Sequence, residues 1–128
     1  MSDFAGRVVL ITGAAGGIGQ AMARLFGERG ATIAALDKSE TVADFAETLN
    51  AEDMKSAAAI ADIGAAEEVA AAIAKLREAL GPISVLINNA GMSTRATLEM
   101  STPSTWGDDV NVNLNGAFNC THAVLDDL

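Results

Sequence analysis

Glycines recur at short intervals near the N-terminus, directly after an apolar, β-branched run. The run Val8–Ile11 is typical of a buried strand, and the segment that follows carries Gly13, Gly16, Gly17 and Gly19. A helical pattern opens there, so the free N–H groups of a helix N-terminus would face whatever the glycines admit. Small residues and helix N–H groups together suit a diphosphate. The alternative is a purely structural turn, because glycines often join strands to helices.

Two carboxylates lie where later strands are predicted to end. Asp37 is placed to accept hydrogen bonds from the ribose hydroxyls of an adenosine, and its charge would repel a 2′-phosphate. Ala14 and Ala15 add no basic group, so the sequence favours NAD over NADP, although Lys38 lies beside the carboxylate. Asp62 could accept a hydrogen bond from the adenine amino group. The alternative for Asp37 is a plain turn residue. The alternative for Asp62 is an N-cap-like residue before a helix.

An Asn88-Asn89-Ala90-Gly91 segment follows the fourth predicted strand. Two amides leaving a strand beside small residues suit contact with a ribose and stabilisation of the sheet. Ser93 and Thr94 come next and are candidates for the nicotinamide side of the same cleft.

Strands and helices alternate along the first two thirds of the chain. This alternation predicts right-handed βαβ units and a parallel sheet, an α/β fold. The predicted strands are 7–11, 31–36, 56–61 and 83–87, and the predicted helices are 17–29, 40–50 and 65–80. Their apolar faces are expected to carry Ile18, Met22, Leu25 and Phe26 in the first helix, Val42, Phe45, Ala46 and Leu49 in the second, and Val69, Ile73, Leu76 and Leu80 in the third.

The pattern loosens after Gly91. We expect a loop over 93–100, a short helical turn over 103–108 and one long helix over 109–128. The long helix would carry Val110, Leu114, Phe118, His122 and Leu125. His122, the single histidine, has no acidic or nucleophilic partner in a recognisable arrangement, so we expect it to pack or to face solvent.

Composition narrows the classes of protein. The 128 residues suffice for one domain, residues 1–128, and a hydrophobic share of 50% excludes a disordered tail. A net charge of −9 argues against nucleic acid or an anionic membrane as partner. The single cysteine, Cys120, favours a reducing compartment and is expected to be structural. No run reaches the roughly 20 apolar residues of a membrane span, so we expect a cytoplasmic protein, and we see no metal site.

Several motifs together resemble the N-terminal half of a short-chain dehydrogenase/reductase. The matching residues are the Thr12–Gly19 turn, Asp37, Asp62-Ile63, Asn88–Gly91 and the stretch from Trp106 through Asn113 to Gly116. The resemblance covers essentially the whole chain. It implies a Rossmann-like parallel sheet of order 3-2-1-4 and a nicotinamide-dependent oxidation or reduction of alcohols and carbonyls.

The resemblance also assigns roles to individual residues. It implies that Gly13, Gly17, Ile18 and Gly19 hold the pyrophosphate, Asp37 the ribose, and Asp62 and Ile63 the adenine. Asn89, Ala90 and Gly91 match the family's contact near the adenosine ribose. Asn113 matches the asparagine of the family's catalytic tetrad, which holds a helix kink and a water. Asn111 and Asn115 match no such role.

One departure from the family pattern concerns the reaction itself. The family needs a Tyr-x-x-x-Lys pair and a serine, and this chain has no tyrosine. We therefore expect the isolated chain to be inactive, as a piece of an NAD-dependent oxidoreductase. The alternative is a stand-alone half-domain that binds a nucleotide or a partner without chemistry. The 83–87 strand would be a sheet edge and the last helix an uncovered apolar face, so we expect a homodimer or higher oligomer.

Overall fold

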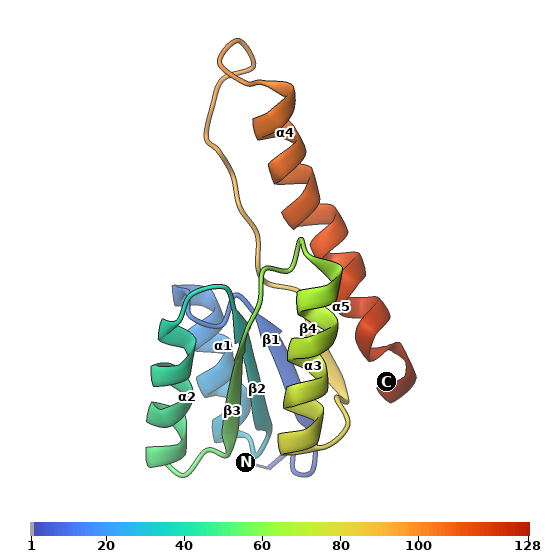
Figure 1. The fold of residues 1–128 in the computed structure, drawn as a ribbon. Coiled ribbons are helices and arrows are strands. Elements are labelled where there is room, and N and C mark those ends of the chain that lie inside the picture. The colour runs from blue at the N-terminus through green and yellow to red at the C-terminus, as the bar shows by residue number, and fades with distance from the viewer. Residues whose placement is uncertain (1) are drawn as a thin grey trace.

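A four-stranded parallel sheet forms the centre of the molecule (Figure 1). The computed structural model describes residues 2–128. The strands are β1 (Val8–Thr12), β2 (Thr32–Asp37), β3 (Ser56–Ile60) and β4 (Val85–Ile87), in the order β3-β2-β1-β4. The order confirms the predicted 3-2-1-4 arrangement. Register pairs Leu10 of β1 with Ala34 of β2 and with Leu86 of β4.

Helices cover both faces of this sheet. The helices α1 (Gly17–Glu28) and α2 (Thr41–Ala51) lie on one face, and α3 (Ala66–Leu80) lies on the other beside the C-terminal helix (Figure 1). Residues of β1 alternate between two cores, with Val9 and Ile11 packed in the core of α1 and α2, and Val8 and Leu10 in the core of α3. Strands covered on both faces explain why their sequences are apolar throughout.

The predicted helix faces are confirmed for α2 and largely for α3. All four residues named for α2 are buried, and in α3 Val69, Ile73 and Leu76 are buried while Leu80 is half-buried. The face named for α1 is right for Met22 and Phe26, which are half-buried against the core of α1 and α2, and wrong for Ile18 and Leu25. Ile18 is 72% and Leu25 51% exposed, and the helix instead buries Gly19 and Ala23. Because Gly19 and Ala23 are small, α1 can lie close to the sheet. The spacing of the large apolar residues in the sequence does not predict this close approach.

The C-terminal region is one continuous helical rod, which corrects the predicted break between 103–108 and 109–128. It comprises α4 (Pro103–Val110), a π-helical segment η1 (Asn111–Asn115), α5 (Gly116–Val124) and a final 3₁₀ turn η2 (Leu125–Asp127). Thr102 caps its start, since its hydroxyl accepts from the N–H of Thr105. Figure 1 shows α4 rising beyond the sheet together with the 93–101 loop.

Element ends elsewhere shift by one or two residues from the predicted ranges. The largest change is at β4, where Ile83 and Ser84 lie outside the strand. The Ser84 hydroxyl accepts from the Val8 N–H at 3.0 Å and from the Arg7 Nε at 3.1 Å, so this segment is fixed by side-chain bonds to β1.

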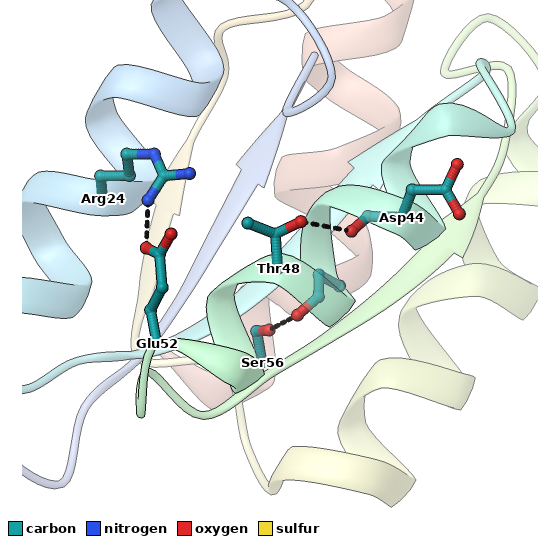
Figure 2. Close-up of polar contacts among 6 residues, drawn as sticks. Arg24, Asp44, Thr48, Glu52 and Ser56 are labelled. Atoms are coloured by element: carbon teal, nitrogen blue, oxygen red, sulfur yellow. Dashed lines mark hydrogen bonds and ion pairs between the residues drawn. The ribbon is translucent and has the colours of Figure 1, made fainter.

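Polar contacts fasten α2 to its neighbours (Figure 2). The Ser56 hydroxyl at the start of β3 donates to the Ala46 carbonyl of α2 at 2.8 Å. Arg24 of α1 pairs with Glu52, the residue that follows the end of α2. Thr48 donates to the Asp44 carbonyl within α2 at 3.0 Å. The exposed pair adds little stability, whereas the buried serine bond fixes where β3 begins.

Cys120 lies fully buried on α5, in the core shared with α3. Burial raises the pKa of its thiol to about 11. A thiol protonated at neutral pH is a poor nucleophile, which supports the structural role expected from the sequence.

Asp127 anchors the end of the rod to the α3–β4 connection. Its carboxylate accepts from the Arg77 Nε at 2.8 Å and from the Ile83 N–H at 3.0 Å. The Ile83 N–H and the Arg77 guanidinium lower the pKa of Asp127 below its ordinary value of 3.8. Since the pKa is depressed in the folded chain, this carboxylate stabilises the fold above that ordinary value, and the stabilisation is lost as the pH falls through the lowered pKa.

Replacing Asp127 by asparagine is therefore expected to destabilise the chain by about 1 kcal/mol at pH 7, or ~4 °C in melting temperature. Melting curves from pH 7 to pH 2 provide the test. The gap between wild type and Asp127→Asn should begin to narrow near pH 3.8 and close once the pH has fallen below the lowered pKa of Asp127. A gap that stays constant across this range would contradict the assigned role. Asp126, which is exposed and precedes it, offers a matched asparagine control with no expected effect.

Candidate functional site

A cleft of about 370 Å³ opens at the carboxyl ends of the strands. It lies where the chain order of the sheet reverses between β1 and β4, the usual place for ligands in open α/β sheets. All ten residues predicted to bind a cofactor line it: Gly13, Gly17, Ile18, Gly19, Asp37, Asp62, Ile63, Asn89, Ala90 and Gly91. Segments widely separated in sequence are thus brought to one site.

The glycine turn is compact because two of its positions admit no side chain. Gly13 has a φ of +66°, and a Cβ there would lie 3.0 Å from the Ala90 Cα. A Cβ on Gly19 would overlap the Gly13 carbonyl oxygen, since the start of α1 packs on the turn. A Cβ on Gly17 would meet nothing within 4 Å, so that position faces open space. The N–H groups of the first turn of α1 have no partner inside the helix and suit an anion.

Asp37 connects β2 to the glycine turn. One carboxylate oxygen accepts from the Ala15 N–H and the other from the Ser39 N–H, both at 2.9 Å. Asp37 is thus a turn-forming residue and a lining residue of the cleft at once. A carboxylate accepts about four hydrogen bonds, so acceptor capacity remains for hydroxyl groups.

Asp62 plays a similar double part at the end of β3. Its Oδ1 accepts from the Gly64 N–H at 2.9 Å, and its side chain lines the cleft. The N-cap of α3 is Ala65, so Asp62 supports the turn before the helix and is not its cap.

Asn89 and Thr12 fasten β4 to the glycine turn. The Asn89 amide donates to the Thr12 carbonyl at 3.1 Å and to the Gly13 carbonyl at 3.3 Å. The buried Thr12 hydroxyl accepts from the N–H groups of Asn89 at 3.0 Å and Ala90 at 2.9 Å. The Asn89 amide is therefore committed to the turn. Asn88 points to α5, where its amide donates to the Thr121 hydroxyl at 3.1 Å.

Asn113 stands outside the cleft but holds one of its walls. Its amide donates to the Met92 carbonyl at 2.7 Å and its Oδ1 accepts from the Met92 N–H at 2.9 Å. Met92 lines the cleft next to Gly91, whose Cβ would lie 2.9 Å from the same Oδ1. Asn113 occupies the middle of η1, where the Gly116 N–H donates to the Asn111 carbonyl five residues back.

Two residues proposed for the nicotinamide side lie outside the cleft, and one residue that supports the cleft was not predicted. Ser93 and Thr94 do not line it, and Thr94 binds Asp109 of α4. Thr12 was absent from the predicted site, although a hydroxyl at a strand end before glycines is a usable signal. Across residues 2–128, no three side chains of the metal-binding types gather.

The sequence of the chain was compared with models of known protein families. A family model described as short chain dehydrogenase matches residues 7–128. The chain belongs to the short-chain dehydrogenase family. This confirms the resemblance drawn from the motifs and places the chain among oxidoreductases.

Individual members of the short-chain dehydrogenase family cover the chain almost fully. The 3-oxoacyl-[acyl-carrier-protein] reductase FabG of Pseudomonas aeruginosa is 37% identical over 121 residues, 94% of this chain and 49% of the relative. A gluconate 5-dehydrogenase of Burkholderia cenocepacia in complex with NADP and tartrate is 37% identical, with a TM-score of 0.89 over 96% of this chain and 49% of its own. A Burkholderia phymatum member in complex with NAD is 27% identical, with a TM-score of 0.91 over 100% of this chain and 46% of its own.

These comparisons concern only part of each relative. The chain spans less than half the length of the first curated relatives it matches, 41% and 49%. One of these solved structures is in complex with NADP and the other with NAD, so membership of the family alone does not select one of the two cofactors. Within residues 2–128, no helix is long and apolar enough to cross a membrane.

Proposed function

We propose that residues 1–128 form one partial Rossmann domain that binds the adenosine diphosphate part of NAD. The chain would be the cofactor-binding half of an oxidoreductase acting on alcohols or carbonyls. The observation that carries this proposal is the convergence of the glycine turn, Asp37, Asp62 and the Asn89–Gly91 segment on one cleft. When bound, the nicotinamide would supply or accept the hydride.

The residues present fit a dinucleotide. A side chain on Gly19 would overlap the Gly13 carbonyl oxygen, so glycine lets the start of α1 lie against the turn, where N–H groups are free to meet a diphosphate. Asp37 and Asp62 offer carboxylate oxygens at two further points of the cleft, suited to ribose hydroxyls and to the adenine amino group. Ile18, Ile63 and Ala90 offer apolar surface between them.

NAD is proposed over NADP because of Asp37. Its two hydrogen bonds from backbone N–H groups keep the carboxylate at the cleft, where it would repel a 2′-phosphate. Lys38 also lines the cleft and partly offsets this repulsion.

Asn113 is proposed as the one catalytic-tetrad member within these residues. Its hydrogen bonds hold Met92 at the wall of the cleft, next to Gly91. The 128 residues contain no tyrosine, so we expect no dehydrogenase activity from them alone. NADH formation from a secondary alcohol by the purified chain would refute that expectation.

Calorimetric titration of the chain tests the cofactor proposal. Binding of both NAD and ADP-ribose, with much weaker binding of NADP, is the expected result. If none of the three ligands binds, the second candidate function is favoured. In that case the chain is a half-domain that forms oligomers and binds no nucleotide. The observation that favours this second candidate is the absence of a tyrosine, which the reaction of the family needs, from the 128 residues.

Replacing Asp37 by asparagine is expected to reduce the preference for NAD over NADP about tenfold, because the charge that repels a 2′-phosphate is removed. The ratio of the two dissociation constants is the measurement. Glu40→Gln is the matched control, since it removes one negative charge from an exposed residue outside the cleft. An equal change of the ratio in both variants would point to net charge and contradict a local role for Asp37.

We also propose a cytoplasmic homo-oligomer. Large apolar side chains stand exposed along the rod, with Leu114 at 66% and Phe118 at 65%, and Trp106 and Leu125 also exposed. Exposed apolar surface of this kind favours association, as does the unpaired edge of β4. Sedimentation velocity should show a dimer or larger species, and a monomer at high concentration would refute this.

A further inference from the structure

Two asparagines of the rod bind the loop that follows β3. The Asn111 amide donates to the Gly64 carbonyl at 3.1 Å, and the Asn119 amide donates to the Ile63 carbonyl at 2.8 Å. Both bonds are partly buried and join residues far apart in sequence. Asp62 and Ile63 of this loop, residues 62–64, line the cleft beyond the end of β3.

We infer that Asn111 and Asn119 are positioning residues for the adenine end of the cleft. This inference rests on the proposed function, in which Asp62 reads the adenine amino group. The Asp62 carboxylate takes its orientation from the Gly64 N–H, at 2.9 Å from Oδ1. Gly64 is in turn held by Asn111, so the direction of the carboxylate depends on the C-terminal rod.

Packing makes this dependence tight. A Cβ on Gly116 of α5 would lie 2.6 Å from the Ile63 Cδ1, so the helix backbone lies directly against the loop. A Cβ on Gly64 would overlap the Asn111 amide nitrogen. The loop therefore cannot slide along the rod without breaking the asparagine bonds.

The π-helical segment η1 links the two ends of the cleft. Asn111 and Asn113 both belong to it, and they bind Gly64 at one end and Met92 at the other. The Asn115 amide donates to the Asn111 Oδ1 at 3.0 Å, which leaves the Asn111 amide nitrogen directed at Gly64. One short segment thus fixes both walls.

The test is Asn111→Asp, which keeps the shape of the side chain and replaces the donor by a carboxylate facing the Gly64 carbonyl. ADP-ribose and its inosine counterpart are titrated into the full chain by calorimetry. The inosine compound carries a carbonyl in place of the amino group. We expect about tenfold weaker binding of ADP-ribose and a smaller preference for it over the inosine compound.

Asn50→Asp is the matched control. Asn50 also holds backbone through its amide, donating to the Ser56 carbonyl at 3.1 Å, but at the opposite end of β3 from the cleft. It should lower the melting temperature and leave the base preference unchanged. Asn115→Ala, which only frees the Asn111 side chain, should shift the preference in the same direction by a smaller factor. This second variant serves if Asn111→Asp does not fold.

The outcomes separate the two claims. A wild-type chain that binds no ADP-ribose would overturn the proposed function and this inference with it. A wild-type chain that prefers ADP-ribose, with the same preference in Asn111→Asp and Asn115→Ala, would overturn the inference alone. A reduced preference in both variants, and not in Asn50→Asp, would support it.

Discussion

Replacing Gly19 by alanine is expected to abolish measurable nucleotide binding and to destabilise the fold by about 2–3 kcal/mol. The added Cβ would overlap the Gly13 carbonyl oxygen and lie 2.9 Å from the Ala14 Cα. Both are backbone atoms of a turn packed on the sheet, so relief requires the start of α1 to move. Movement there also displaces the N–H groups offered to the diphosphate. Thermal melts and ADP-ribose titrations of the variant are the measurements.

Two other glycines provide the controls for this substitution. Gly107→Ala on α4 adds a methyl group that meets nothing within 4 Å, and alanine favours the helix, so stability should hold or rise slightly. Gly17→Ala also meets nothing within 4 Å but lies at the cleft, so it should weaken binding with little change in stability. If Gly19→Ala melts at the same temperature as Gly107→Ala, the backbone around Gly13 is not rigid and can move away from the added methyl group.

Replacing Thr12 by valine is expected to cost about 2–4 kcal/mol of unfolding free energy, because two partly buried backbone donors lose their acceptor. The Thr12 hydroxyl accepts from the Asn89 and Ala90 N–H groups, and the side chain is fully buried. Valine has nearly the same shape, so loss of packing contributes little. Urea-induced unfolding measures the effect. The urea concentration at the midpoint should fall, while the dependence of the unfolding free energy on urea concentration stays the same.

Thr12→Ser separates the hydroxyl from the methyl group. Serine keeps the acceptor and should cost only about 1 kcal/mol. If Thr12→Val and Thr12→Ser are equally stable, the hydroxyl does not hold β4 to the glycine turn. Nucleotide affinity should follow the same order, since Asn89 and Ala90 line the cleft.

Much of this architecture follows from local sequence patterns. The apolar runs of β1 and β2 are covered on both faces, so their composition alone identifies them as strands of a parallel sheet. The glycines, Asp37 and Asp62 follow strand ends, and parallel strands bring their carboxyl ends to one edge. The site lining was therefore predictable once the order of strands and helices was recognised.

Other features depend on contacts that no local pattern contains. Asn111 and Asn119 are polar helix positions like many others, and their partners Gly64 and Ile63 lie in a loop after a different strand. Ile18 and Leu25 of α1 were wrongly expected to be buried, because the helix approaches the sheet closely through Gly19 and Ala23. The predicted join between 108 and 109 lies inside α4, and the π-helical segment within the predicted long helix was not foreseen because its composition does not differ from that of an α-helix.

The π-helical segment decides where the rod tolerates a change in length. Each residue added to or removed from an α-helix rotates everything beyond it by about 100°, so a deletion in α5 ahead of Cys120 would turn Cys120 and Val124 out of the core they fill. Deleting one residue within Asn111–Asn115 would instead let the wider π-helical turn close as a regular α-helical turn, and the residues beyond it would keep their faces. The extra residue of this segment therefore serves the asparagine bonds at the cleft and not the packing of the core.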